Sequence, residues 1–171
     1  SSSSEISGAV YIPDEPEDES YDHNKEMIFK FNDLKFKGSF LALRVEGDKI
    51  SIDEKIKALT NELGLNKLNS TILDVYQSTP FWIKINNLEL FKSTKNNLLR
   101  VVVPPSKGNK LMQYLDNKYK YYIDWCGSLY WIEVQAKKTN KVGEVKKLVK
   151  ELEGYLTIIK TSNEFDYEET I

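Results

Sequence analysis

Cysteine and histidine are almost absent from this chain, which has one of each among 171 residues. A single thiol excludes an internal disulfide framework and any cysteine-built metal site. A single imidazole excludes a histidine-rich metal site. No apolar run approaches the roughly 20 residues of a membrane-spanning helix. The formal charge of −2 gives no general attraction to nucleic acid or to an anionic membrane surface. The sequence therefore predicts a soluble protein of a reducing compartment.

Short catalytic motifs are also missing. The sequence has no glycine-rich phosphate loop and no GxSxG, HExxH or CxxC pattern. Cys126 has no visible basic partner, which favours an ordinary turn residue, and His23 lies in an acidic segment. We therefore expect no metal site and no self-contained nucleophilic catalysis.

The first half of the chain predicts strands around an acidic loop. Apolar patterns over residues 6–12 and 36–46 indicate two strands. Residues 13–25 are rich in acidic side chains and lack apolar periodicity, so we expect a solvated loop there. Ser51 and Glu54 form a capping-box pattern, which predicts the start of an amphipathic helix.

Residues 70–91 favour two short helices hinged near Pro80, because proline removes a helical hydrogen bond. Arg44 and Glu46 can lie on one face of a strand end, where a structural ion pair is the favoured explanation. The expected buried side chains of the helical segment are Phe81, Trp82, Leu88 and Phe91.

The second half has a regular alternation of elements. Its predicted strands cover residues 98–103, 119–125, 129–135 and 155–160. Ser106 is expected to cap the first helix, after Pro104 and Pro105 end a strand. The second helix carries the apolar positions Val142, Val145, Leu148, Val149 and Leu152.

This order, βαββαβ, is the split βαβ arrangement of a ferredoxin-like domain. The predicted fold class is therefore α+β, with a ferredoxin-like unit over about residues 98–160, preceded by a partial, similar α+β unit. Residues 1–92 and 93–171 are expected to be two subdomains of one composite domain.

The aromatic hairpin of the second half has two different faces. With Cys126 and Gly127 as the turn residues, alternation places one apolar set beneath the two helices. The opposite face is mixed, and it is expected either to pack against the first subdomain or to form a wall of a ligand pocket. This mixed set contains Lys120, Tyr122, Asp124, Leu129, Trp131 and Glu133.

Four residues of this region are candidate site residues. Arg100 can bind a carboxylate through two parallel hydrogen bonds, or it can form a structural ion pair. Asp124, beside Trp125, is either a desolvated carboxylate suited to binding or proton transfer, or a turn residue that accepts backbone N–H groups. Gly127 supplies a positive φ angle at the turn.

Four segments carry a resemblance to a known family. Leu99-Arg-Val-Val-Val-Pro-Pro-Ser106 resembles W-R-L-S-V-P-P-S/T, and Ile123-Asp-Trp-Cys-Gly-Ser-Leu-Tyr-Trp-Ile132 resembles Y-D-W-G-G-G-L-V-W-L. Upstream, Glu5-Ile-Ser-Gly-Ala-Val-Tyr-Ile-Pro13 resembles E-V-S-G-A-A-H-L-P, and Leu43-Arg-Val-Glu-Gly47 resembles L-R-L-E-G. These patterns, in this order, are those of the E subunits of bacterial glycolate oxidase, within the FAD-linked oxidase family of PCMH-type flavoproteins. The chain departs from them at Leu99, Cys126 and Ser128, where the family has one tryptophan and two glycines.

The resemblance implies the C-terminal cap region of an FAD-dependent 2-hydroxy-acid oxidoreductase that converts glycolate to glyoxylate. A flavin-binding domain would precede residue 1 and bind most of the FAD, so this piece alone would be inactive. The expected partners are that domain, a second FAD subunit and an iron–sulfur subunit, in the cytoplasm or peripherally at the inner membrane. The flavin edge or the substrate would lie near Arg100, Asp124, Trp125 and Gly127.

Two other functions stay open. The chain can be a non-catalytic ferredoxin-like module that binds a protein, a small effector or single-stranded RNA. RNA bases would stack on Tyr122 and Trp131 beside Lys120, although the acidic balance argues against nucleic acid. A purely structural subunit would dock a partner on the same sheet face.

Overall fold

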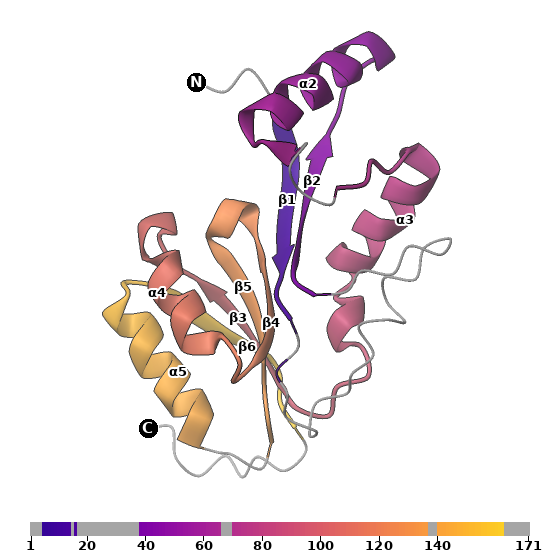
Figure 1. The fold of residues 1–171 in the computed structure, drawn as a ribbon. Coiled ribbons are helices and arrows are strands. Elements are labelled where there is room, and N and C mark those ends of the chain that lie inside the picture. The colour runs from indigo at the N-terminus through magenta and orange to yellow at the C-terminus, as the bar shows by residue number, and fades with distance from the viewer. Residues whose placement is uncertain (1–4, 15, 17–37, 66–69, 137–139, 163–171) are drawn as a thin grey trace.

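The computed structural model describes residues 5–14, 16, 38–65, 70–136 and 140–162, which form one sheet with helices on both sides (Figure 1). Most of the predicted acidic loop, residues 15 and 17–25, lies outside the described residues. The elements are β1 (Ile6–Ile12), β2 (Phe40–Val45), α2 (Lys49–Glu62), α3 (Val75–Asn86), η2 (Glu89–Phe91), β3 (Asn97–Val102), α4 (Pro105–Leu115), β4 (Lys120–Asp124), η3 (Trp125–Gly127), β5 (Leu129–Val134), α5 (Asn140–Glu151) and β6 (Tyr155–Lys160).

The six strands lie in the order β2-β1-β4-β5-β3-β6, and every neighbouring pair is antiparallel. The fold class is therefore α+β, as predicted. In the second half, β5 lies between β3 and β4, and β3 lies between β5 and β6. Each of the helices α4 and α5 thus connects two parallel strands that have a third strand between them, which is the split βαβ order.

Apolar side chains fill the space on both sides of this sheet. On one side α4 and α5 cover the sheet, as Figure 1 shows, over a core drawn from β3, β4 and β5. On the other side α3 and η2 cover β1, β4 and parts of β3 and β5. The second core comprises Val10, Ile12, Phe81, Trp82, Ile85, Leu90, Phe91, Leu98 and Tyr122.

The predicted register of the aromatic hairpin is confirmed. Asp124 pairs with Leu129, Tyr122 with Trp131, and Lys120 with Glu133. The predicted two-residue turn is wrong, because β4 ends at Asp124 and the connection runs from Trp125 to Ser128. Its extra residues leave the pairing unchanged, since they are added symmetrically to both ends of the turn.

The predicted caps of two helices are also wrong, because each helix begins at a different residue from the one predicted. The capping-box prediction for Ser51 and Glu54 fails because Asp48, in an extended conformation, caps α2 and accepts the Ser51 N–H at 3.0 Å. Ser106 does not cap α4, because Pro105 already occupies the first helical position, where its fixed φ suits a helix and no donor is lost.

The predicted hinge at Pro80 is also wrong, since α3 continues through it as one helix. Asp74 and Gln77 form a complete capping box at the start of α3, and their spacing is a helix-start signal that the hinge prediction did not take into account. Burial of large side chains after the proline offsets its lost hydrogen bond. Of the expected core residues, Phe81, Trp82 and Phe91 are buried, whereas Leu88 is half-buried.

Gly108 on α4 provides a test of how closely this helix approaches the hairpin. A Cβ atom there would lie 2.8 Å from Tyr130 Oη and 3.0 Å from Gly127 O. We expect Gly108→Ala to lower the free energy of unfolding by about 1–3 kcal/mol, because the packed hairpin cannot yield. In α5, Gly143→Ala meets no atom within 4 Å, so this matched control should gain up to ~1 kcal/mol from helix propensity. Equal effects in urea denaturation would contradict the close approach.

The buried hydroxyl of Tyr130 should make the free energy of unfolding depend on pH. Its hydroxyl donates to Gly108 O at 2.9 Å. Burial, aided by the charge of Asp116, raises the pKa of Tyr130 from 10.0 to about 12. The folded state thus holds this proton more tightly, so its stabilising effect is complete below pH 10.0 and is lost as pH rises toward about 12.

We therefore expect Tyr130→Phe to be less stable than the parent by about 1–2 kcal/mol near neutral pH, because the buried hydrogen bond to Gly108 O is lost. Between pH 10.0 and about 12 the difference should shrink, since the variant lacks this ionisation. Urea denaturation of both proteins across that range measures it, and a constant difference would disprove the assignment.

Candidate functional site

Arg100 is a charged candidate residue that lies within the sheet. It lies in the middle of β3, on the face opposite α4 and α5, between Trp131 on β5 and Thr157 on β6. The side chain is half-buried, and its Cζ atom lies 5.3 Å from the centroid of the Trp125 ring. Within the described part of the chain, the guanidinium has no hydrogen bond and no carboxylate partner. The structural ion pair considered for Arg100 is therefore not formed among these residues.

The η3 turn positions Trp125 above Arg100. Asp124 accepts the Trp125 N–H at 2.7 Å, so its carboxylate caps the turn. Trp125, Cys126 and Gly127 all have positive φ angles, of 50°, 51° and 93°. This strained backbone turns the indole out of the strand, and Trp125 is 58% exposed.

The four candidate residues thus divide into two pairs. The structure brings Arg100 and Trp125 together, whereas Asp124 and Gly127 shape the turn that holds Trp125 in place. The turn explanation of Asp124 is the one that its hydrogen bond supports. A Cβ atom at Gly127 would meet nothing within 4 Å, so the glycine serves the backbone conformation and not a close internal contact.

Strand β6 also contributes to this site, which the sequence alone did not predict. The register places Tyr155 opposite Val102 and Thr157 opposite Arg100, on the same face of the sheet. Tyr155 is 80% exposed, and no strand covers the outer edge of β6 in the described part of the chain. We call this surface the Arg100 face, defined by Arg100, Val102, Trp125, Tyr155 and Thr157. The strand alternation around Arg100 and the predicted split βαβ order, which places the last strand beside residues 98–103, were the available signals, but the register between these two strands could not be predicted.

The rest of this sheet face is covered by α3 and η2. Tyr122 stacks on Phe91 with 5.7 Å between ring centroids and donates a hydrogen bond to Ile85 O at 3.1 Å. The expectation that the mixed hairpin face packs against the first subdomain is therefore confirmed. Tyr122 is 1% and Lys120 is 4% exposed, so they cannot form the RNA-stacking platform considered above.

A buried polar cluster anchors the segment that leads into β3. Glu133 accepts hydrogen bonds from Thr94 Oγ1 and Asn96 Nδ2, both at 2.6 Å. Asn96 Oδ1 in turn accepts the Ala136 N–H at 3.2 Å, and Lys160 Nζ donates to Thr94 O. These bonds satisfy the carboxylate internally, so Glu133 is a structural residue.

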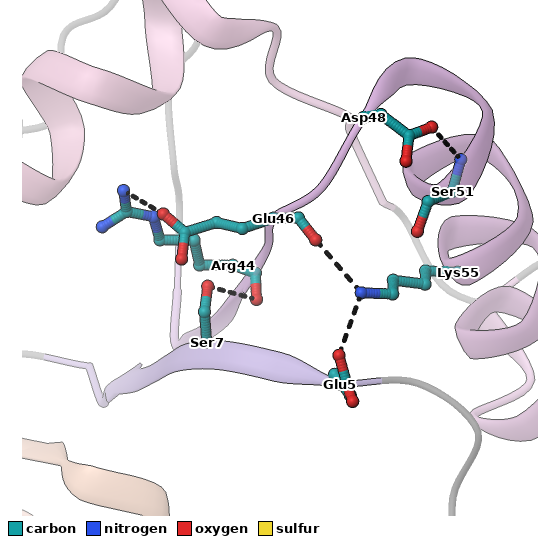
Figure 2. Close-up of polar contacts among 7 residues, drawn as sticks. All are labelled: Glu5, Ser7, Arg44, Glu46, Asp48, Ser51 and Lys55. Carbon is teal, nitrogen blue, oxygen red and sulfur yellow. Dashed lines mark hydrogen bonds and ion pairs between the residues drawn. The ribbon is translucent and has the colours of Figure 1, made fainter.

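A second polar cluster ties the β1–β2 hairpin to α2 (Figure 2). Arg44 Nη2 lies 2.6 Å from Glu46 Oε1, as expected for a structural pair. Lys55 Nζ donates to Glu5 Oε2 at 3.3 Å and to Glu46 O at 3.1 Å. The Ser51 N–H holds the pKa of Asp48 below its usual value. The acidic groups of this cluster are exposed and the two cations, Arg44 and Lys55, are already paired, so this cluster offers no unpaired cation for a ligand.

Other kinds of site find no support in the described residues. No group of three or more His, Cys, Asp or Glu side chains is placed to hold a metal ion there. In the same part of the chain, no helix has the length and apolarity needed to cross a membrane. No family model, curated protein or solved structure matches this chain. The features that bear on function are therefore the Arg100 face and the resemblance of the four segments.

A stability measurement distinguishes the Arg100 face from the buried polar cluster. We expect Arg100→Met to change the free energy of unfolding by less than about 1 kcal/mol, because only the stacking on Trp125 is lost. Glu133→Ala, on the adjacent strand, should cost roughly 2–5 kcal/mol, because buried donors lose a charged acceptor. Urea denaturation of both variants checks the contrast. A large loss for Arg100→Met would mean that Arg100 is structural.

Proposed function

We propose that this chain is the substrate-side cap of an FAD-dependent 2-hydroxy-acid oxidoreductase of the FAD-linked oxidase family, with Arg100 as the group that binds the substrate carboxylate. The observation that carries the proposal is the half-buried residue Arg100, whose five guanidinium donors have no acceptor among the described residues. A partly desolvated charge without a partner lowers stability, and such departures from good packing concentrate at binding sites. A carboxylate fits the guanidinium through two parallel hydrogen bonds.

Trp125 prepares Arg100 for that role. A cation–π contact, with Arg100 Cζ 5.3 Å from the centroid of the Trp125 ring, restricts the guanidinium without using its hydrogen-bond donors. A carboxylate would bind to Arg100 more tightly, because the arginine side chain has less conformational entropy left to lose on binding. The exposed indole would also shield the ion pair from water once a second surface covers the Arg100 face.

The chemistry of the Arg100 face fits the substrate end of a flavoenzyme better than the dinucleotide end. A guanidinium flanked by aromatic rings suits a carboxylate and a flat ring edge, whereas the sequence has no glycine-rich loop for a pyrophosphate. FAD, when bound, supplies the acceptor for the hydride of the substrate. In this proposal its dinucleotide is held by the flavin domain that the resemblance places before residue 1, and that domain covers the Arg100 face.

The resemblance also supplies the wider setting of the proposal. The substrate would be glycolate or another 2-hydroxy acid, oxidised to the corresponding 2-oxo acid. The complex would contain a second FAD subunit and an iron–sulfur subunit, in the cytoplasm or peripherally at the inner membrane. A carboxylate-binding module without catalysis would use the same guanidinium, so the experiment must detect the flavin as well as binding.

The test uses the complete protein encoded around this sequence, purified with its partner subunits. We expect a flavin absorbance spectrum and reduction of an artificial electron acceptor when glycolate or lactate is added. Arg100→Met should lower kcat/KM at least about 30-fold, because truncating one partner of a desolvated charge pair costs 2–5 kcal/mol. Arg100→Lys should recover only part of it, since lysine cannot make the paired hydrogen bonds.

Arg44 provides the matched control, because it is the other arginine of the chain and pairs with Glu46 at the exposed end of β2. Arg44→Met should leave the kinetics unchanged. Unchanged kinetics for Arg100→Met would exclude Arg100 from the site. A colourless complete protein with no affinity for FAD would favour the non-catalytic binding module.

A further inference from the structure

We infer that the Arg100 face selects 2-hydroxy acids that carry an apolar substituent on the hydroxyl-bearing carbon, in preference to glycolate. This inference rests on the proposed function and extends it to the choice of substrate. It depends on Trp125, which contacts the guanidinium of Arg100, and on Tyr155, which lies on the neighbouring strand β6 and is 80% exposed.

Sheet geometry places Tyr155 within reach of a ligand held by Arg100. Arg100 pairs with Thr157, and Tyr155 is two residues before Thr157 on the same face of β6. Diagonal neighbours of this kind have Cβ atoms roughly 7–8 Å apart, a distance that an aromatic side chain spans. Trp125 contacts the guanidinium from the side of the η3 turn. The substituent of a carboxylic acid bound to Arg100 could therefore contact the ring of Tyr155 and the ring of Trp125.

The polarity of the surface fits a monoanion with an apolar tail. Arg100 is the one charged member of the Arg100 face, and half-buried Val102 lies beside it. Trp125 is 58% and Tyr155 is 80% exposed, so both rings have apolar area left to bury. Glycolate has only hydrogen as its substituent and would leave that area uncovered. A branched or aromatic substituent would cover it, while a second carboxylate would find no partner among the residues of this face.

The experiment compares substrates in the complete, flavin-loaded protein. We expect kcat/KM to rise from glycolate through lactate to 2-hydroxy-4-methylpentanoate or 3-phenyllactate, by roughly tenfold or more overall. Tyr155→Ala should remove most of that gain, because kcat/KM for the bulky substrates should fall much more than kcat/KM for glycolate. Tyr76→Ala is the matched control, because Tyr76 on α3 is also exposed, at 86%, but is not part of the Arg100 face.

A binding measurement makes the inference independent of turnover. Titration calorimetry with 3-phenylpropanoate and with acetate, which lack the 2-hydroxyl, should show tighter binding of the aromatic acid, and Tyr155→Ala should reduce this difference. A preference for glycolate would overturn the inference while leaving the proposed function intact. A uniform change for all substrates in Tyr155→Ala would also overturn it, because Tyr155 would then pack against protein. No oxidation of any 2-hydroxy acid would overturn the proposed function itself.

Discussion

Burial of the β4–β5 hairpin on both faces is the constraint on which the rest of the structure depends. Tyr121, Ile123, Tyr130 and Ile132 need the cover of α4 and α5, while Tyr122 needs the cover of α3 and η2. The sheet must therefore extend toward β1 on one side, so that the first subdomain can supply the second layer. Within the described ranges, the strands farthest from that layer, β3 and β6, are left with a partly uncovered face. The Arg100 face is a consequence of this asymmetry.

Helix α4 and the β4–β5 hairpin are in close contact near the hairpin turn. Tyr130 reaches α4 through its hydrogen bond to Gly108 O, and a side chain at Gly108 would collide with both Tyr130 and the Gly127 carbonyl. The same turn carries three residues with positive φ angles. Helix α4 thus packs against the strained η3 turn, and this turn holds Trp125 in contact with Arg100.

Much of the second half of the fold could be predicted, because alternation and turn signals there are local. Period-two patterns fixed which hairpin residues face the helices, and the register survived an incorrect turn length. The helix starts were less predictable, since Asp48 and Asp74 compete with other acceptable caps such as Ser51. Tyr155 was missed as a site residue, because its nearness to Arg100 depends on the register between two strands that are far apart in the sequence.

Arg100 is not required by the packing of β3. Its neighbours along β3, Leu99 and Val101, are fully buried on the helix side, so the strand is anchored whatever residue occupies position 100. An apolar side chain there would pack against Trp131 and reduce the cost of a partly desolvated charge. The guanidinium instead lies on a rigid strand, is stacked by Trp125 and lacks an acceptor among the described residues. The proposed carboxylate binding requires this combination, because a permanent internal ion pair would compete with the ligand for the same donors.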